Sequence, residues 1–216
     1  MTAAGPTRKG RWVAYAVLAA FAFSLGLLGW GLRPVGVVVG PYRGPVERAL
    51  VVDPQRGAVR EGVLDGDRYQ VGIPEAAREP VVLLEGPNGS SVRSSPFVPA
   101  ERIDLPLLAL WQASPRLRVE AGEVRADWPP VPPEEGYPDP LRYSLLFVYR
   151  KPAGRGEASL LSREPSLTIS LGELRGLLKD RDPGAREVEV EVRAFDPSQP
   201  QGALWVGGRI AWRLPD

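Results

Sequence analysis

Residues 187–195 read Glu-Val-Glu-Val-Glu-Val-Arg-Ala-Phe, an alternation of charged and apolar side chains. Successive side chains of a β-strand point to opposite faces of a sheet, so this pattern predicts a strand. Its inward face is formed by Val188, Val190, Val192 and Ala194. The glutamates at 187, 189 and 191 could be taken for a cation site, but their alternate positions are explained by the solvated face of an edge or half-exposed strand.

The rest of the chain after Pro34 repeats this β character. Short β-branched and aromatic runs are interrupted by Gly, Pro and Asp roughly every eight to twelve residues, a spacing typical of sandwiches. The clearest break is the stretch from Trp111 to Pro115. The sequence therefore predicts an all-β protein with two tandem immunoglobulin-like β-sandwich domains, at residues 35–113 and 115–216.

The second domain has a distinctive order of aromatic and aliphatic residues. In a predicted second strand, Val124, Ala126 and Trp128 alternate onto one face, and Trp128 ends the strand. Tyr143 opens a third strand, and Leu174 precedes the strand at 187–195. In this order residues 115–216 resemble a fibronectin type III module, which implies a binding or spacer role and not catalysis. The family's tyrosine at the start of the sixth strand is replaced by Val188, so other contacts must fix that corner.

The first domain carries a looser resemblance. Residues 55–85 contain a glycine-rich run, an Asp65-Gly66-Asp67 turn, a strand over 69–73 and a valine-rich strand over 81–84. In the strand over 69–73, Tyr69, Val71 and Ile73 alternate onto one face. This succession resembles the carboxypeptidase-regulatory-like and transthyretin-like sandwiches. A calcium site at the two aspartates is the alternative to a plain turn, but calcium needs six or more oxygen ligands and no acidic cluster adjoins them. Asn88-Gly89 predicts a tight hairpin, because both residues tolerate positive φ.

A transmembrane helix is predicted at residues 12–32. These 21 residues carry no charge, and a helix of this length spans about 31 Å, close to the hydrocarbon thickness of a bilayer. The tail at residues 1–11 contains Arg8, Lys9 and Arg11, which predicts a cytoplasmic N-terminus and extracytoplasmic domains. Signal-peptide cleavage at Ala20-Phe21-Ala22 is the alternative; it would leave an apolar new terminus, which favours an uncleaved anchor.

The composition removes most familiar enzyme mechanisms. The 216 residues include no Cys and no His, which excludes thiol nucleophiles, His-based triads and the commonest transition-metal ligands. Three of the 27 Lys and Arg lie in the tail, so the exported part is slightly acidic against 26 Asp and Glu and has no basic stripe for nucleic acid. We expect no enzyme activity, no cofactor, no metal and no nucleic-acid partner. A membrane-tethered hydrolase using a Ser-Lys dyad or paired carboxylates is the remaining alternative.

Two groups of residues are candidates for contact with partners. Small side chains at Ala16, Ala20 and Ser24 share one face of the predicted span, where another transmembrane helix could approach closely; such residues are also common in any span. The second group is exported and comprises Pro129, Pro130, Pro132, Pro133, Trp205 and Trp212. The prolines could dock into an aromatic groove or merely stiffen a loop, and the tryptophans could be contact residues or core.

These features together predict a location and a general role. We expect a single-pass inner-membrane protein of the bacterial cell envelope that binds or scaffolds other proteins outside the cytoplasm. The bacterial assignment follows the excess of Arg over Lys, a sign of a GC-rich genome. The alternative is an accessory subunit of a transport, secretion or respiratory complex, in which the span packs against partner helices. The expected partners are the lipid bilayer and envelope or membrane proteins.

Overall fold

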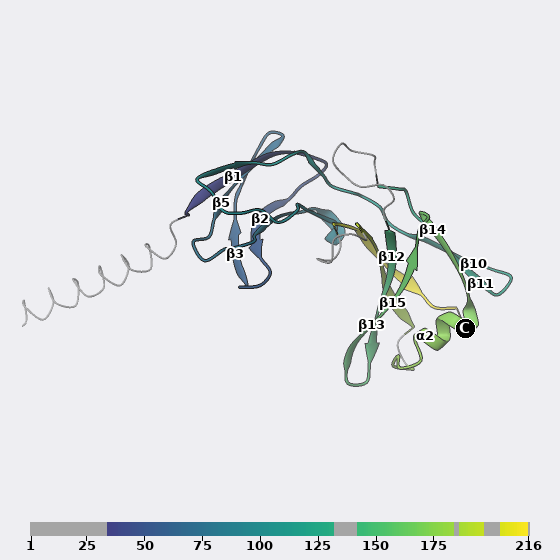
Figure 1. Ribbon diagram of the computed structural model, residues 1–216. Coiled ribbons are helices and arrows are strands. Elements are labelled where there is room, and N and C mark those ends of the chain that lie inside the picture. Colours follow the sequence, from purple (N-terminus) through teal and green to yellow (C-terminus); the bar gives the residue numbers. More distant parts are fainter. Residues whose placement is uncertain (1–33, 132–141, 184–185, 197–203, 216) are drawn as a thin grey trace, which may run out of the picture.

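The computed structural model describes residues 34–131, 142–183, 186–196 and 204–215. Within them almost every element is a β-strand; the exceptions are the helical turn η1 (Pro87–Gly89) and the short helix α2 (Leu171–Leu177). The predicted all-β class is therefore confirmed (Figure 1). No helix of these residues is long and apolar enough to cross a membrane. The predicted span at residues 12–32, with Ala16, Ala20 and Ser24, lies outside the described residues.

The first sandwich consists of two layers of strands whose apolar faces meet. One sheet has the order β4-β5-β1-β8, with β9 also paired to β1, and the facing layer contains β3, β2, β6 and β7. Val38 and Val71 from one layer and Val51 and Val82 from the other are fully buried between them. The strand bounds are β1 (Gly36–Arg43), β2 (Arg48–Asp53), β3 (Ala58–Glu61), β4 (Val63–Asp65), β5 (Arg68–Ile73), β6 (Val81–Glu85), β7 (Ser91–Arg93), β8 (Arg102–Asp104) and β9 (Leu108–Ala109).

The two predicted turns of this sandwich differ in outcome. Gly66 has φ +59°, and Asp65 pairs with Arg68 across it, so the stretch at 65–67 forms the plain two-residue hairpin that the sequence favours. Asn88 and Gly89 do adopt positive φ, at 58° and 77°. Their connection, however, is not a tight hairpin: it passes through η1 between paired Glu85 and Ser91.

The second sandwich packs a three-stranded layer against a four-stranded one. The first has the order β10-β11-β14 and the second β13-β12-β15-β16. Val124, Ala126 and Trp128 face inward as their alternation predicts, and so do Val188 and Val190 of β15. The strand bounds are β10 (Arg116–Glu120), β11 (Glu123–Asp127), β12 (Arg142–Lys151), β13 (Gly154–Ser162), β14 (Ser166–Ser170), β15 (Glu187–Phe195) and β16 (Trp205–Arg213).

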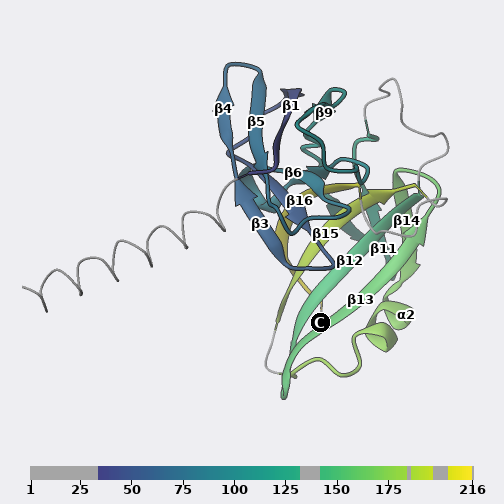
Figure 2. The ribbon, with the colours of Figure 1, turned by 60° about the vertical axis from the view of Figure 1, so that its left-hand side comes forward.

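The two sandwiches share a sheet. Strand β16 of the second pairs antiparallel with β7 of the first, where Trp205 is opposite Val92 and Val206 is opposite Ser91. The backbone N–H of Arg93 also donates to the carbonyl of Leu204 at 2.8 Å. A continuous eight-stranded sheet, β13-β12-β15-β16-β7-β6-β2-β3, therefore runs through both sandwiches (Figure 2). Backbone hydrogen bonds across the junction fix the orientation of one sandwich against the other.

The connecting segment at residues 110–115 is packed into this junction. Ala113 is fully buried, and its carbonyl accepts a 2.7 Å hydrogen bond from the N–H of Gly208. Gly207 and Gly208 form a β-bulge, because Glu191 pairs with Arg209 whereas Arg193 pairs with Val206. A Cβ on Gly207 would lie 2.2 Å from the Ala113 carbonyl oxygen, so only glycine allows this close approach.

Helix α2 occupies the connection between β14 and β15, where the sequence has Val188 in place of the tyrosine of the modules that it resembles. Ser170 accepts a hydrogen bond from the N–H of Glu173, and the Glu173 carboxylate accepts one from the N–H of Ser170, forming a capping box. Leu174 and Leu178 are buried beneath the helix. A capped helix with two leucine anchors thus covers this corner in place of a tyrosine hydroxyl.

Candidate functional site

The outward side of strands β13, β12, β15 and β16, here called the outer sheet face, carries a cluster of paired charged side chains around Glu191. The sequence predicts a solvated row at Glu187, Glu189 and Glu191, but Glu191 is only 1% exposed. That part of the prediction is wrong because β15 is not an edge strand: β12 and β16 flank it on both sides. Arg193 of β15 itself and Arg209 of β16 cover the carboxylate.

Two arginines neutralise the buried carboxylate. Arg193 Nε donates to Glu191 Oε1 at 2.6 Å, and Arg209 Nη2 donates to Oε2 at 2.7 Å. The hydrogen bond from Arg209 to Glu191 is the main cause that raises the pKa of this guanidinium above its usual value. Charge-assisted bonds of this kind order both side chains, so the cluster presents a fixed pattern of charge.

The cluster extends through Glu189 to the edge of the sheet. Glu189 is 3.4 Å from Arg209 Nη1 and 4.0 Å from Arg155 Nη2 on edge strand β13. Because these side chains are about half exposed, their ion pairs contribute little to stability. The charged groups of Glu189, Arg209 and Arg155 therefore remain accessible to a polar partner.

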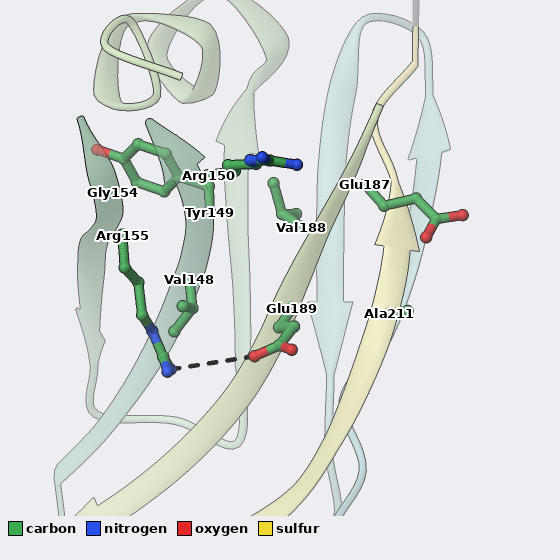
Figure 3. Close-up of a pocket in the computed structure, with 9 residues that line it drawn as sticks. All are labelled: Val148, Tyr149, Arg150, Gly154, Arg155, Glu187, Val188, Glu189 and Ala211. Carbon is green, nitrogen blue, oxygen red and sulfur yellow. Dashed lines mark ion pairs between the residues drawn. The ribbon is translucent and has the colours of Figure 1, made fainter. Parts of the chain in front are cut away.

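A shallow cleft of about 410 Å³ opens beside Arg155 and Glu189 (Figure 3). Val148 and Ala211 contribute apolar surface, Arg150 and Arg155 contribute guanidinium groups, and Glu187 and Glu189 contribute carboxylates. Cationic and anionic groups therefore both line this cleft. Such a surface suits a partner with complementary charges, and charge complementarity gives binding specificity more than affinity.

The exported contact candidates fall into different environments. Trp205 is 1% exposed and packs in the core, so the core alternative applies to it and not the partner contact. It lies where β16 pairs with β7, opposite Val92. Trp212 is half-buried against the same core. Pro129 and Pro130 are exposed, whereas Pro132 and Pro133 lie outside the described residues.

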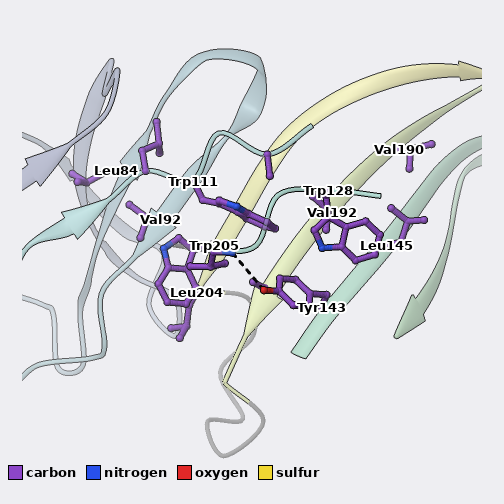
Figure 4. Close-up of a cluster of buried hydrophobic side chains, with 14 of the residues drawn as sticks. Leu84, Val92, Trp111, Trp128, Tyr143, Leu145, Val190, Val192, Leu204 and Trp205 are labelled. Atoms are coloured by element: carbon purple, nitrogen blue, oxygen red, sulfur yellow. Dashed lines mark hydrogen bonds between the residues drawn. The ribbon is translucent and has the colours of Figure 1, made fainter. Parts of the chain in front are cut away.

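The junction contains an aromatic cluster (Figure 4). The ring centroid of Tyr143 is 6.0 Å from that of Trp111 and 5.8 Å from that of Trp128. Trp111 Nε1 donates to the carbonyl of Pro129 at 3.2 Å, and the hydroxyl of Tyr143 accepts from the N–H of Val131 at 3.4 Å. These bonds attach the start of the proline-rich loop to the core, so Pro129 and Pro130 are presented from a fixed base.

Sequence reasoning missed the Glu191 cluster for an identifiable reason. A signal was present, because Arg193 and Arg209 are basic residues in the last two strands. Their relation to Glu191 depends on the register between β15 and β16, including the bulge at Gly207 and Gly208. Without that register, the arginines cannot be assigned to the glutamate.

Comparison with known proteins assigns the chain to no family. No family model matches the chain, and no curated protein matches it. Among solved structures, a DUF3823 family protein from Parabacteroides merdae aligns over 84% of this chain and 100% of its own, with 10% identity and a TM-score of 0.31. The chicken CNTN1 FN1-FN3 domains align over 86% of this chain and 65% of their own, with 12% identity and a TM-score of 0.30. A cytokine receptor complex aligns over 82% and 96%, with 17% identity and a TM-score of 0.31. At these values the chain is not assigned to any of the neighbours' families.

Proposed function

We propose that this chain is a membrane-anchored binding or scaffolding protein of the bacterial envelope, with both sandwiches on the extracytoplasmic side. Residues 12–32 form its anchor, and the outer sheet face is its binding surface. The observation that carries the proposal is the sheet shared by the two sandwiches through β7 and β16. A shared sheet makes one stiff body, and stiffness is what a scaffold requires.

The anchor and this body are close in sequence. Only Arg33 separates Leu32, the last residue of the proposed span, from Pro34, and β1 begins at Gly36. A connection this short leaves little freedom between span and sandwich. The outer sheet face would therefore stand at a set distance from the membrane.

We further propose that the second sandwich is a fibronectin type III-like module. The layers β10-β11-β14 and β13-β12-β15-β16 support this, as does the packing of Trp128 on Tyr143. Such modules serve as binding units or spacers, and either role fits an anchored scaffold.

The alternative is an accessory subunit of a larger membrane complex. The small-residue face at Ala16, Ala20 and Ser24 favours it, since close helix approach requires small side chains. The two proposals differ in the surface that binds the partner: the span in one and the outer sheet face in the other.

The test is purification of the tagged full-length chain from its native membrane in mild detergent, with mass spectrometry of co-purifying proteins. Three variants are compared with the parent: exchange of residues 1–33 for an unrelated anchor, Glu189→Arg on the outer sheet face, and Glu120→Arg on β10 as the control. The scaffold proposal expects partners that survive anchor exchange and Glu120→Arg but are lost with Glu189→Arg. Partners lost only on anchor exchange would replace it with the subunit alternative. Protease resistance of the C-terminal tag in intact spheroplasts would contradict the proposed orientation.

A further inference from the structure

A second concavity, of about 600 Å³, lies on the outward side of the five-stranded sheet of the first sandwich. Val37 and Val39 of β1 contribute to its lining, since they alternate with buried Val38. Gly72 of β5 makes room at one end: a Cβ there would lie 3.0 Å from Pro34 Cβ and from Arg60 Nε. Here the concavity is called the Pro34 cleft.

The place of the Pro34 cleft follows from the proposed anchor, on which this inference rests. Leu32 ends the span two residues before Pro34, and two extended residues reach at most about 7 Å. The headgroup layer on each side of a bilayer is about 5–8 Å thick. The cleft wall at Pro34 therefore lies at the level of the phospholipid headgroups.

The chemistry of the cleft fits that layer. Arg60 and Arg68 line it, and guanidinium groups suit phosphate oxygens. Asp65 lines it as well and can accept hydrogen bonds from an ammonium group. A fourth charged residue, Glu61, is already bonded to Arg48 through both carboxylate oxygens, each at 3.2 Å.

We propose that the Pro34 cleft binds the headgroup of a zwitterionic aminophospholipid, with phosphate toward the arginines and ammonium toward Asp65. The carboxylate of Asp65 beside the two arginines favours this headgroup over a purely anionic one, because only the former offers it an ammonium group. The cleft's volume lies in the range of small-molecule sites.

Exposed apolar side chains occur on the same sandwich. Val63, which lines the cleft, is 69% exposed, Val59 on neighbouring β3 is 59% exposed, and Val35 beside Pro34 is 46% exposed. Water-exposed valines at the membrane surface can transfer apolar area into the interface. They would thereby help to hold the cleft against the bilayer.

The first test measures position, using the full chain in vesicles. The chain contains no cysteine, so single labels can be introduced without background. Val63→Cys and Leu161→Cys form a matched pair, because both side chains are 69% exposed and they lie on different sandwiches. Each carries a fluorophore in phosphatidylethanolamine–phosphatidylglycerol vesicles containing a headgroup-attached quencher. The proposal expects loss of fluorescence at 63 and none at 161; equal behaviour at the two sites would overturn it.

The same samples separate failure of the anchor from failure of the cleft. A carbonate wash before the fluorescence measurement releases any chain that does not span the bilayer. A released chain overturns both the anchor and this inference, whereas a retained chain without selective quenching at 63 overturns this inference alone.

The second test measures headgroup recognition. The full chain is purified in detergent, and the phosphatidylethanolamine retained per chain is determined by native mass spectrometry. Combining Asp65→Asn with Arg68→Gln should reduce retention about tenfold, since hydrogen bonds to charged groups are lost. The control combines Arg118→Gln with Glu120→Gln on β10 and should retain lipid as the parent does. Unchanged retention in the first variant, preferential retention of phosphatidylglycerol, or a protein cross-linked through residue 63 in native membranes would each contradict the proposal.

Discussion

Gly207→Ala should destabilise the whole described body, because this glycine lies where the connecting segment meets the shared sheet. An added Cβ would be 2.2 Å from the carbonyl oxygen of Ala113 and 2.8 Å from Cγ1 of Val192. Neither Ala113 nor Val192 can move away from this Cβ easily. Ala113 is fully buried and its carbonyl is bonded to the N–H of Gly208, and Val192 is fully buried in β15.

The magnitude follows from these two contacts. Overpacking of a well-packed core costs about 1–3 kcal/mol, and a buried hydrogen bond lost by displacement of Ala113 adds about 1 kcal/mol or more. We expect a decrease in the free energy of unfolding of about 2–4 kcal/mol. With a urea dependence of about 2 kcal/mol per molar, the midpoint should fall by about 1–2 M.

The assay is urea unfolding of the full chain in mild detergent, followed by tryptophan fluorescence and by circular dichroism. Gly176→Ala is the control, since Gly176 lies in α2 with no heavy atom within 4 Å of an added Cβ. This variant should be more stable than the parent by about 0.5–1 kcal/mol, because alanine is the better helix residue. A Gly207→Ala midpoint equal to that of the parent would refute the packing argument for the junction.

Three further predictions concern polar groups. Glu191→Gln should lower the free energy of unfolding by about 2–4 kcal/mol, because one partner of a buried ion pair is lost. Glu189→Gln, at an exposed position, should lower it by at most about 1 kcal/mol. Equal urea midpoints for the two variants would contradict the buried cluster. Hydrogen bonds from the backbone N–H groups of residues 78, 55 and 56 lower the pKa of Asp53 below its usual value. The stabilising effect of the Asp53 carboxylate is therefore complete above its unfolded pKa and is lost as pH falls through its folded pKa. Urea midpoints measured from pH 7 to pH 3 should fall less steeply for Asp53→Asn than for the parent, and parallel curves would count against this. Ser170→Ala removes the cap of α2 and should cost about 0.5–2 kcal/mol, measured by the same urea unfolding; a cost no larger than that of Ser159→Ala, on β13, would argue against the capping box.

Local patterning predicted the strands well. The alternation at 187–195 and at 124–128 correctly identified inward side chains, as did that at 69–73, where Tyr69, Val71 and Ile73 are fully buried. Alternation works here because each of these strands has one face against the sandwich core. The turn at Gly66 was predicted for a similarly local reason, the tolerance of glycine for positive φ.

The surroundings of two side chains were not predicted correctly. Trp205 was a contact candidate, yet it is buried, because β16 pairs with a strand that precedes it by more than one hundred residues. Glu191 was assigned to a solvated face, yet Arg193 and Arg209 cover it. In both cases the error concerns what lies beside or above a strand, which alternation along that strand does not encode.

The sequence by itself determined the all-β class, the inward face of the main strands and the exclusion of mechanisms that need Cys or His. These depend only on side-chain type and on a period of two along each strand. Only the tertiary structure decided that β7 and β16 join two sandwiches into one sheet, that Glu191 is enclosed by arginines, and that Pro34 borders a cleft. The physical reason is that strand neighbours are chosen by long-range backbone pairing, in which the hydrogen-bonding groups are the same for nearly every residue.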